Sequence, residues 1–509
     1  MQLPLQCDAD STLSLQDQLF SQIRQLILNG CLTPGTRMPA SRMLASDLKV
    51  SRNTVVLTYD RLIAGGYLES HHPVGTFVAS DFVPDDVCSP APDALIQTGK
   101  NNGKLLKSPP KRAPVHFKGK PHVVVSPYKT EVPYDFLVGR PDARLFPIKD
   151  WMQNMRRKLR DMQEGNSVYV EPSGLPRLRE AVAHYVGGAR GIQADPEQIV
   201  IVNGTQEALT LLSQLFIREG TPVATENPCY QGAANVFASH GASLHPVPVD
   251  SEGIAVEKLP SKASLVYLTP AHQYPTGAML SPARRRRLLR WCYSTGAYAL
   301  EDDYNSDFCY DTTPLPALKS QDTADQVIYL GTFSKSLGAG LRAGYMVVPR
   351  HLVGPLTVAK GLLNNCSGWA VQALLAEFLI SGEYTDHLRR IRTRYKARRN
   401  RLLSLLDRYG AKGCIHGAHG GMHIAWELPP GWPTAAQLEV QARDRGVGVY
   451  GLQAAGVYIA GRQAESRYQS TVLFGYAALD RGEIAAGIKR LVEQQDTRSE
   501  VPRTVSANA

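Results

Sequence analysis

One lysine stands where a reactive amine would be useful. Lys335 closes the stretch Gly331-Thr332-Phe333-Ser334-Lys335, directly after an apolar run at 327–330 that predicts a buried strand. Arg342 follows seven residues later. Burial and a nearby cation lower the pKa of a lysine, and the neutral amine is the form that adds to an aldehyde. This spacing favours covalent amine chemistry at Lys335.

Two further groups suit a phosphate. Gly204-Thr205-Gln206 follows an apolar run at 199–202 and opens a predicted helix. A helix N-terminus that begins with glycine is a ready anion site. The guanidinium of Arg342 can hold the same anion with two N–H groups.

A carboxylate and a phenol follow another apolar run, at 297–300. Asp302 can pair with a protonated pyridine nitrogen, and Tyr304 can donate to a ring oxygen. Each group also has a plainer interpretation: Asp302 as a helix cap, Tyr304 as an edge of the core and Lys335 as a solvated lysine. Their common order at strand ends favours one phosphate-bearing pyridine cofactor.

The elements that must position these groups alternate along the chain from about residue 134 to 494. Apolar runs stand at 199–202, 222–225, 265–268, 297–300 and 327–330, and helical stretches such as 207–216 and 282–293 lie between them. This alternation predicts an α/β domain with a mainly parallel sheet and helices on both faces. Such sheets bind ligands at the carboxyl ends of their strands.

The first 80 residues have a different pattern. Apolar spacing, caps and turns predict helices near 14–29, 41–48 and 51–65, and short strands near 67–69 and 76–78. This order is typical of a winged helix-turn-helix. We expect the second helix to bury Met43, Leu44 and Leu48.

Polar residues of this segment suit DNA. Arg52, Asn53 and Thr54 open the third helix, where a recognition helix meets base edges. Arg37 and Ser41-Arg42 flank the start of the second helix, which suits a phosphate. The alternative is a small helical cap with solvated arginines.

Composition sets the broad class. The chain has 509 residues, 43% hydrophobic and 20% charged, and a net charge of +10, so two or three globular domains are expected. No apolar run suits a membrane helix, the cysteines are scattered without a Cys-x-x-Cys pair, and no signal peptide is evident. We therefore expect a cytoplasmic protein. The histidine spacing predicts no metal site.

The N-terminal segment resembles the GntR family of regulators. The matching stretches are Pro34-Gly35-Thr36-Arg37-Met38-Pro39-Ala40-Ser41-Arg42, Val50-Ser51-Arg52-Asn53-Thr54-Val55, Gly66-Tyr67-Leu68 and Gly75-Thr76-Phe77-Val78. This resemblance implies that DNA is contacted by Arg37, Ser41, Arg42, Ser51, Arg52, Asn53, Thr54 and Gly75.

The remainder resembles the aminotransferase-like domain of MocR-type regulators. The matching stretches include Phe136-Leu137-Val138-Gly139-Arg140-Pro141-Asp142, Glu226-Asn227-Pro228-Cys229-Tyr230, Thr269-Pro270-Ala271-His272-Gln273-Tyr274-Pro275-Thr276-Gly277 and Glu301-Asp302-Asp303-Tyr304. The resemblance implies a pyridoxal 5'-phosphate (PLP) transferase of fold type I, with a large and a small lobe.

It also implies roles for single residues. Lys335 would form the Schiff base with PLP, Asp302 would hold the pyridine nitrogen, Tyr304 would meet the ring oxygen and Tyr230 would pack on the ring face. The phosphate would be held by Thr205, Gln206, Thr332 and Arg342.

Two departures from aminotransferases bear on the chemistry. Tyr274 stands where many of them have an asparagine that bonds the ring oxygen. The expected strand at 471–476 lacks the arginine that usually holds the substrate carboxylate. Arg462 and Arg467 lie nearby on what we expect to be a loop, and either can serve an effector carboxylate.

These features predict a PLP-dependent transcription regulator that senses an amine, an amino acid or PLP itself by transaldimination at Lys335. The alternatives are a working aminotransferase with a DNA-binding head, and a repressor whose large domain only dimerises. The resemblance also implies a homodimer, domain-swapped head to tail, and we expect it to bind double-stranded DNA with repeated half-sites.

The expected divisions are a DNA-binding domain at 1–80, a flexible linker at 81–130, an effector domain at 131–495 and a disordered tail at 496–509. The linker is basic, with no acidic residue between Lys100 and Lys120.

Overall fold

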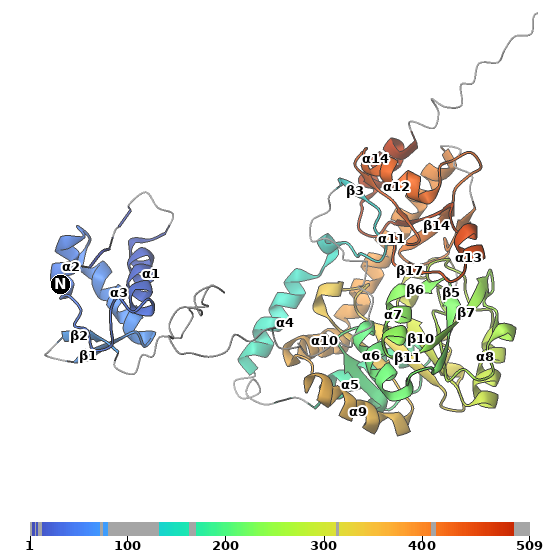
Figure 1. The fold of residues 1–509 in the computed structure, drawn as a ribbon, viewed down its shortest axis with the longest axis horizontal. Helices are drawn as coiled ribbons and strands as arrows, with labels where there is room; N and C mark the ends of the chain where they lie inside the picture. The colour runs from blue at the N-terminus through green and yellow to red at the C-terminus, as the bar shows by residue number, and fades with distance from the viewer. Residues whose placement is uncertain are drawn as a thin grey trace, which may run out of the picture. The chain divides into compact units, whose positions relative to one another are not determined.

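The computed structural model describes residues 3–5, 7–8, 13–71, 75–79, 132–161, 169, 171–311, 315–408 and 414–492. The chain divides into two compact units, Met1–Ala113 and Pro114–Ala509, which Figure 1 shows as ribbons. The predicted linker at 81–130 and the predicted tail at 496–509 lie outside the described residues.

The N-terminal unit has the predicted order of three helices and a hairpin. The helices are α1 (Leu15–Leu28), α2 (Ser41–Asp47) and α3 (Arg52–Ala64), and the antiparallel strands are β1 (Leu68–His71) and β2 (Gly75–Val78). Ser14 and Ser51 cap α1 and α3, because each side chain accepts a backbone N–H of the first turn. The winged helix-turn-helix is confirmed.

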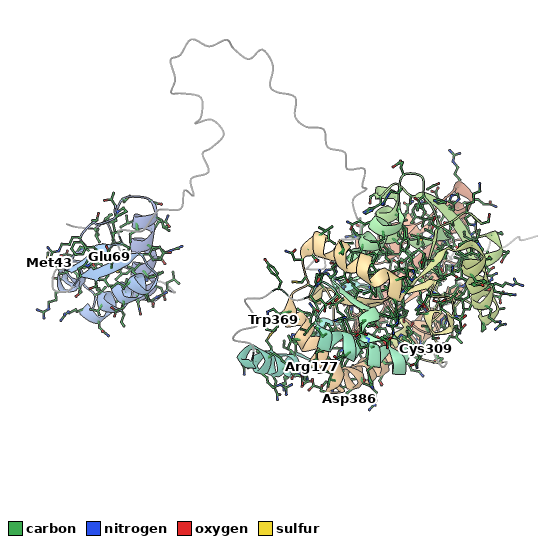
Figure 2. All side chains as sticks on the ribbon, turned by 90° about the horizontal axis from the view of Figure 1, so that it is seen from below. Met43, Glu69, Arg177, Cys309, Trp369 and Asp386 are labelled. Atoms are coloured by element: carbon green, nitrogen blue, oxygen red, sulfur yellow. The ribbon has the colours of Figure 1, made fainter. Side chains whose placement is uncertain are left out.

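The prediction that Met43 is buried was wrong. Leu44 and Ala45 are the buried residues of α2, Leu48 is partly buried, and Met43 is 60% exposed. Adjacent residues on a helix are about 100° apart, so a helix as short as α2 turns few positions inward. Met43 lies at the edge of this unit in Figure 2.

The C-terminal unit is built on an eight-stranded sheet. In sheet order its strands are β4 (Ile199–Val202), β12 (Gly344–Val347), β11 (Val327–Thr332), β10 (Tyr298–Asp303), β9 (Leu265–Leu268), β5 (Pro222–Asn227), β7 (Ser243–Asp250) and β8 (Gly253–Ile254). β12 runs antiparallel to both of its neighbours, β8 runs antiparallel to β7, and the other pairs are parallel. The predicted mainly parallel sheet is confirmed.

Helices cover both faces of this sheet, as Figure 1 shows. One face packs against α6 (Thr205–Phe216), α7 (Gln231–Ser239) and α9 (Arg350–Asn364). The other packs against α8 (Pro282–Thr295), α5 (Pro176–Arg190) and α10 (Trp369–Ile380). The α4 helix (Ile148–Asp161) contacts α10. Burial on both faces explains why the strands read as continuous apolar runs.

A smaller lobe is built on a four-stranded sheet. Its strands, in order, are β13 (Ile415–His416), β14 (His423–Glu427), β18 (Thr471–Gly475) and β16 (Tyr450–Gly451), and its helices are α11 (Glu383–Arg408), α12 (Ala435–Arg443) and α14 (Arg481–Val492).

Two short strand pairs connect this lobe to distant segments. β3 (Tyr134–Asp135) runs parallel to β15 (Val447–Gly448), and β6 (Cys229–Tyr230) runs antiparallel to β17 (Val457–Tyr458).

A buried ion pair joins α6 to α9. Lys360 Nζ lies 2.9 Å from Glu207 Oε1, with the lysine side chain fully buried and the glutamate side chain 8% exposed. Ser367 Oγ also accepts from this ammonium, at 3.0 Å. Removing one partner of such a pair leaves a buried charge without compensation.

We predict that Lys360→Met lowers the free energy of unfolding of this unit by about 3–5 kcal/mol, because Glu207 stays buried and charged. Urea unfolding of the full chain measures the loss. The double variant Lys360→Met/Glu207→Gln should recover a large part of it. A loss below about 1 kcal/mol in the single variant would show that the pair contributes little.

Candidate cofactor site

Lys335 lies just beyond the carboxyl end of β11. Its Nζ donates to the carbonyl oxygen of Gly139 at 3.0 Å. A Cβ on Gly139 would lie 2.8 Å from this nitrogen, so a side chain at that position would crowd the amine. Burial lowers the pKa of Lys335, and the nearby charge of Asp302 partly opposes that shift. The neutral amine is therefore easier to reach than in a solvated lysine.

Asp302 lies at the carboxyl end of the neighbouring strand, β10. Its Oδ2 accepts from the hydroxyl of Tyr267 at 2.6 Å, whereas its Oδ1 is buried and has no hydrogen-bond partner among the described residues. Burial raises the pKa of Asp302 to about 6, while the Tyr267 hydroxyl acts in the opposite direction. A buried oxygen without a partner is costly, so this atom is set to accept a hydrogen bond from a ligand.

Three tyrosines surround the space between these groups. The Tyr304 hydroxyl is buried and has no partner among the described residues. Tyr274 donates to the carbonyl oxygen of Ala455 at 2.5 Å, so its hydroxyl joins the large lobe to the small one. Tyr230 accepts from Gln206 Nε2 at 3.0 Å, and its ring meets that of Tyr274 edge to face.

A positively polarised cradle forms at the start of α6. Thr205 is the first residue of this helix, and Gly204 before it has a φ of +99°. A Cβ on Gly204 would lie 3.3 Å from Arg342 Nη2, so the guanidinium sits against the glycine. The helix N-terminus and the guanidinium both attract anions.

Arg342 itself has a left-handed backbone conformation, with φ +49°. This conformation costs a non-glycine residue about 1–2 kcal/mol. Such strain persists where the surrounding structure enforces it, often at functional sites. Thr332, at the end of β11, accepts from the backbone N–H of Ser334 at 3.1 Å.

These groups fit PLP. The unpartnered Asp302 oxygen suits the protonated ring nitrogen, the unpartnered Tyr304 hydroxyl suits the ring oxygen, and the cradle of Gly204 and Arg342 suits the phosphate. When bound, PLP supplies an aldehyde that can react with a lysine amine.

The two arginines expected to read an effector carboxylate lie on a helix and not on a loop. Arg462 and Arg467 are both exposed, at the two ends of α13 (Arg462–Arg467). Arg467 lines a cavity of about 890 Å³ between the lobes, together with Asp250, Glu427 and Tyr468. None of the residues expected to hold PLP lines this cavity.

Two contacts of the site were not predicted from the sequence. Tyr267 is fully buried in β9 and holds Asp302. Its signal was a polar hydroxyl inside an otherwise apolar run. The carbonyl oxygen of Gly139 contacts Lys335, and Gly139 belongs to a recognised motif, but the motif did not reveal this partner.

In the N-terminal unit the residues expected to contact DNA lie mainly at the surface. Arg37, Arg42, Ser51, Arg52 and Asn53 are exposed, and Ser41, Thr54 and Gly75 are half-buried. A Cβ on Gly75 would lie 3.3 Å from Arg37 Nε, so the hairpin supports that guanidinium.

Two features of the described residues bear on a metal site and on membrane insertion. Cys414, His416 and Glu427 place one ligand atom each within 4.8 Å of one another, but all three are exposed. Among the helices that the structure describes, none is long and apolar enough to cross a membrane.

Comparisons with known families match both units. Residues 15–78 match the model of bacterial regulatory proteins of the gntR family, and residues 136–491 match that of aminotransferase class I and II.

Single proteins similar to this chain include both transcriptional regulators and aminotransferases. The chain is 35% identical to the probable rhizopine catabolism regulatory protein MocR of Rhizobium meliloti, over 79% of each chain. It is 32% identical to the transcriptional regulator TauR of Rhodobacter capsulatus, over 85% of this chain and 88% of TauR. Among solved structures, the α-aminoadipate aminotransferase LysN of Thermus thermophilus superposes with a TM-score of 0.63 at 30% identity, over 72% of this chain and 92% of LysN.

The Tyr267–Asp302 hydrogen bond predicts a pH effect on cofactor binding. The hydroxyl stabilises ionised Asp302, so Tyr267→Phe should raise the Asp302 pKa above its value of about 6. As the pH is lowered, PLP affinity then begins to fall at a higher pH in the variant, because protonated Asp302 cannot accept from the ring nitrogen. We expect the midpoint of the fall to move up by about one pH unit. Fluorescence titration with PLP at a series of pH values measures it.

Tyr329→Phe is the matched control. Tyr329 donates to Asp303 on the opposite face of the sheet, so its loss should leave the midpoint unchanged. Equal midpoints in the wild type and Tyr267→Phe would contradict the assignment of Asp302 to the ring nitrogen.

Proposed function

This chain belongs to the MocR-type transcriptional regulators, which join a GntR helix-turn-helix to an aminotransferase class I and II domain, and we propose that it binds PLP and senses an amine or amino acid. The observation that carries this proposal is an amine and a carboxylate near the ends of neighbouring strands. Lys335 is held by one backbone carbonyl group, and Asp302, close enough to act on its charge, is buried with one oxygen unpartnered among the described residues.

The proposed signal starts at Lys335. When PLP is bound, its aldehyde carbon can hold one amine, and an effector amine competes with Lys335 for it. Release of Lys335 changes its contact with Gly139. The segment that contains Gly139 also contacts the small lobe: the backbone N–H of Gly475 donates to the carbonyl oxygen of Phe136 at 2.8 Å. Exchange of the amine can therefore bias the arrangement of the two lobes. A ligand shifts such an equilibrium only by its difference in affinity for the two states.

The proposed reader of DNA is α3. Its exposed N-terminal residues, Arg52 and Asn53, are the ones expected to contact base edges, while Arg37 and Arg42 are expected to contact phosphates. A helix-turn-helix regulator of this family implies a DNA operator.

We propose a homodimer on repeated half-sites. The exposed face of α9 supports it, because Val358 is 64% exposed and Leu362 is 86% exposed. Large apolar side chains grouped on one surface are typical of an interface. In the proposed arrangement the head of each chain packs on the effector domain of its partner.

A working aminotransferase is the second candidate. The LysN superposition and the fit of the site to PLP favour it. Sustained conversion of an amino acid in the presence of a keto-acid acceptor supports the enzyme, whereas a regulator stops at amine exchange or after half a reaction.

We predict that Lys335→Ala binds the operator within about twofold of wild-type affinity but no longer responds to amines. Lys335 belongs to the C-terminal unit, whereas the residues expected to contact DNA belong to the N-terminal unit, so the head should fold and bind DNA without this amine. Fluorescence anisotropy of a labelled operator, with and without amine, measures both quantities. A Lys335→Ala protein that responds to amines like the wild type would contradict the proposed signal.

Arg52→Ala and Arg42→Ala should separate base contacts from phosphate contacts. We expect Arg52→Ala to weaken operator binding by about 1–3 kcal/mol and binding to unrelated DNA much less. Arg42→Ala should weaken both in proportion and reduce the salt dependence. Equal ratios of operator to unrelated-DNA affinity in the two variants would overturn this division of roles.

A further inference from the structure

Arg140 is the residue next to the backbone contact of Lys335. The carbonyl oxygen of Gly139 accepts from Lys335 Nζ at 3.0 Å, and Arg140 follows directly in the chain. The arginine side chain is 23% exposed, so it is partly buried without being sealed.

The guanidinium of Arg140 is only partly used. Its Nη2 lies 3.1 Å from Asp135 Oδ2 and 3.4 Å from the carbonyl oxygen of Asp135. Among the described residues, Nε and Nη1 have no hydrogen-bond partner. Arginine offers five N–H donors in a planar fork that matches a carboxylate. One edge of this fork is therefore free for an anion.

Asp135 is already held by other donors. Its Oδ1 accepts from the Tyr450 hydroxyl at 2.6 Å and from the backbone N–H of Leu137 at 3.2 Å, and its side chain is 3% exposed. The Tyr450 hydroxyl and the Leu137 N–H therefore stabilise the Asp135 carboxylate together with Arg140. The arginine thus keeps part of its attraction for a second carboxylate, and Asp135 fixes its direction.

The neighbouring strand of the small lobe offers no cation among its described residues. Leu473 of β18 is buried with Leu452 and Val457, and Val138 and Tyr274 pack against this cluster. Tyr450, which holds Asp135, is the cross-strand neighbour of Leu473. Arg140 therefore places a positive charge beside Asp135 and Tyr450, one residue from the carbonyl group that holds Lys335.

We propose that Arg140 forms a carboxylate-binding subsite beside Lys335, so that the effector is an amino acid rather than a simple amine. This inference rests on the proposed function, and it adds the class of effector. Lys335 and PLP take the amino group, and the free edge of Arg140 takes the carboxylate. Arg462 and Arg467 are less suited, because both are exposed and Arg467 lines the separate cavity of about 890 Å³.

Paired probes test the subsite on the full-length, PLP-loaded protein. L-alanine, L-leucine and L-phenylalanine are each compared with the amine that lacks the carboxylate: ethylamine, 3-methylbutylamine and phenethylamine. The shift of the cofactor absorption band gives the affinity of each probe, and operator anisotropy gives a second readout. The variants are Arg140→Gln, Arg140→Lys, Arg462→Gln and Arg467→Gln.

In the wild type, at least one acid should bind about 10- to 100-fold more tightly than its paired amine. Arg140→Gln should remove that preference and leave the affinity of the amines within about threefold. Arg140→Lys keeps a charge beside Asp135 and should retain part of the preference, which separates recognition from loss of fold. Arg462→Gln and Arg467→Gln should behave like the wild type.

The subsite is overturned if no acid is preferred by the wild type, if Arg140→Gln weakens acids and amines equally, or if Arg462→Gln or Arg467→Gln removes the preference instead. In those cases amines still shift the cofactor band, so the proposed function survives. If no probe shifts the band or the operator affinity of the wild type, the proposed function fails and the subsite fails with it.

Discussion

The site depends on a carboxylate buried at the end of a strand with only one of its oxygens paired. Asp302 is 5% exposed, its Oδ2 is held by Tyr267, and its Oδ1 has no partner among the described residues. Such an arrangement is costly in the free protein and is compensated when a cation binds. Lys335, just beyond the next strand, gives its described hydrogen bond to the carbonyl oxygen of Gly139 and not to this carboxylate. The open oxygen therefore favours a ligand with a protonated nitrogen.

The large sheet and the small lobe together bring the groups of this site close to one another. Strands β9, β10 and β11 are parallel neighbours, so their carboxyl ends lie at the same edge of the sheet. Tyr267 and Asp302 are in β9 and β10, and Lys335 follows three residues after the end of β11. Glycines allow backbone segments to approach closely where side chains would collide. A Cβ on Gly475 would lie 2.3 Å from the carbonyl oxygen of Leu137, so the small lobe rests directly on the segment that holds Lys335. Events at the amine are thereby connected to the lobe interface.

Much of the fold could be predicted from the sequence, because local signals and burial agreed. Apolar runs bounded by turns indicated the strands of the large sheet, and the caps Ser14 and Ser51 indicated the helix starts of the head. Met43 was misplaced because a short helix carries too little periodicity to define its inner face. The segment around Arg462, expected to be a loop, is a short helix. This helix was not predicted because its exposed polar residues give no apolar pattern. Of the site, the strand-end groups were predictable from their order, whereas the Tyr267 and Gly139 contacts depend on cross-strand register and on packing between segments far apart in sequence.

The central claim is that an amine acts on DNA binding through exchange at Lys335. The most direct test is to fix the cofactor to Lys335 by borohydride reduction of the PLP-loaded protein and then titrate amino acids against a labelled operator. The account predicts that the reduced protein binds the operator but does not respond, while the untreated protein does. An equal response in the reduced protein would contradict it.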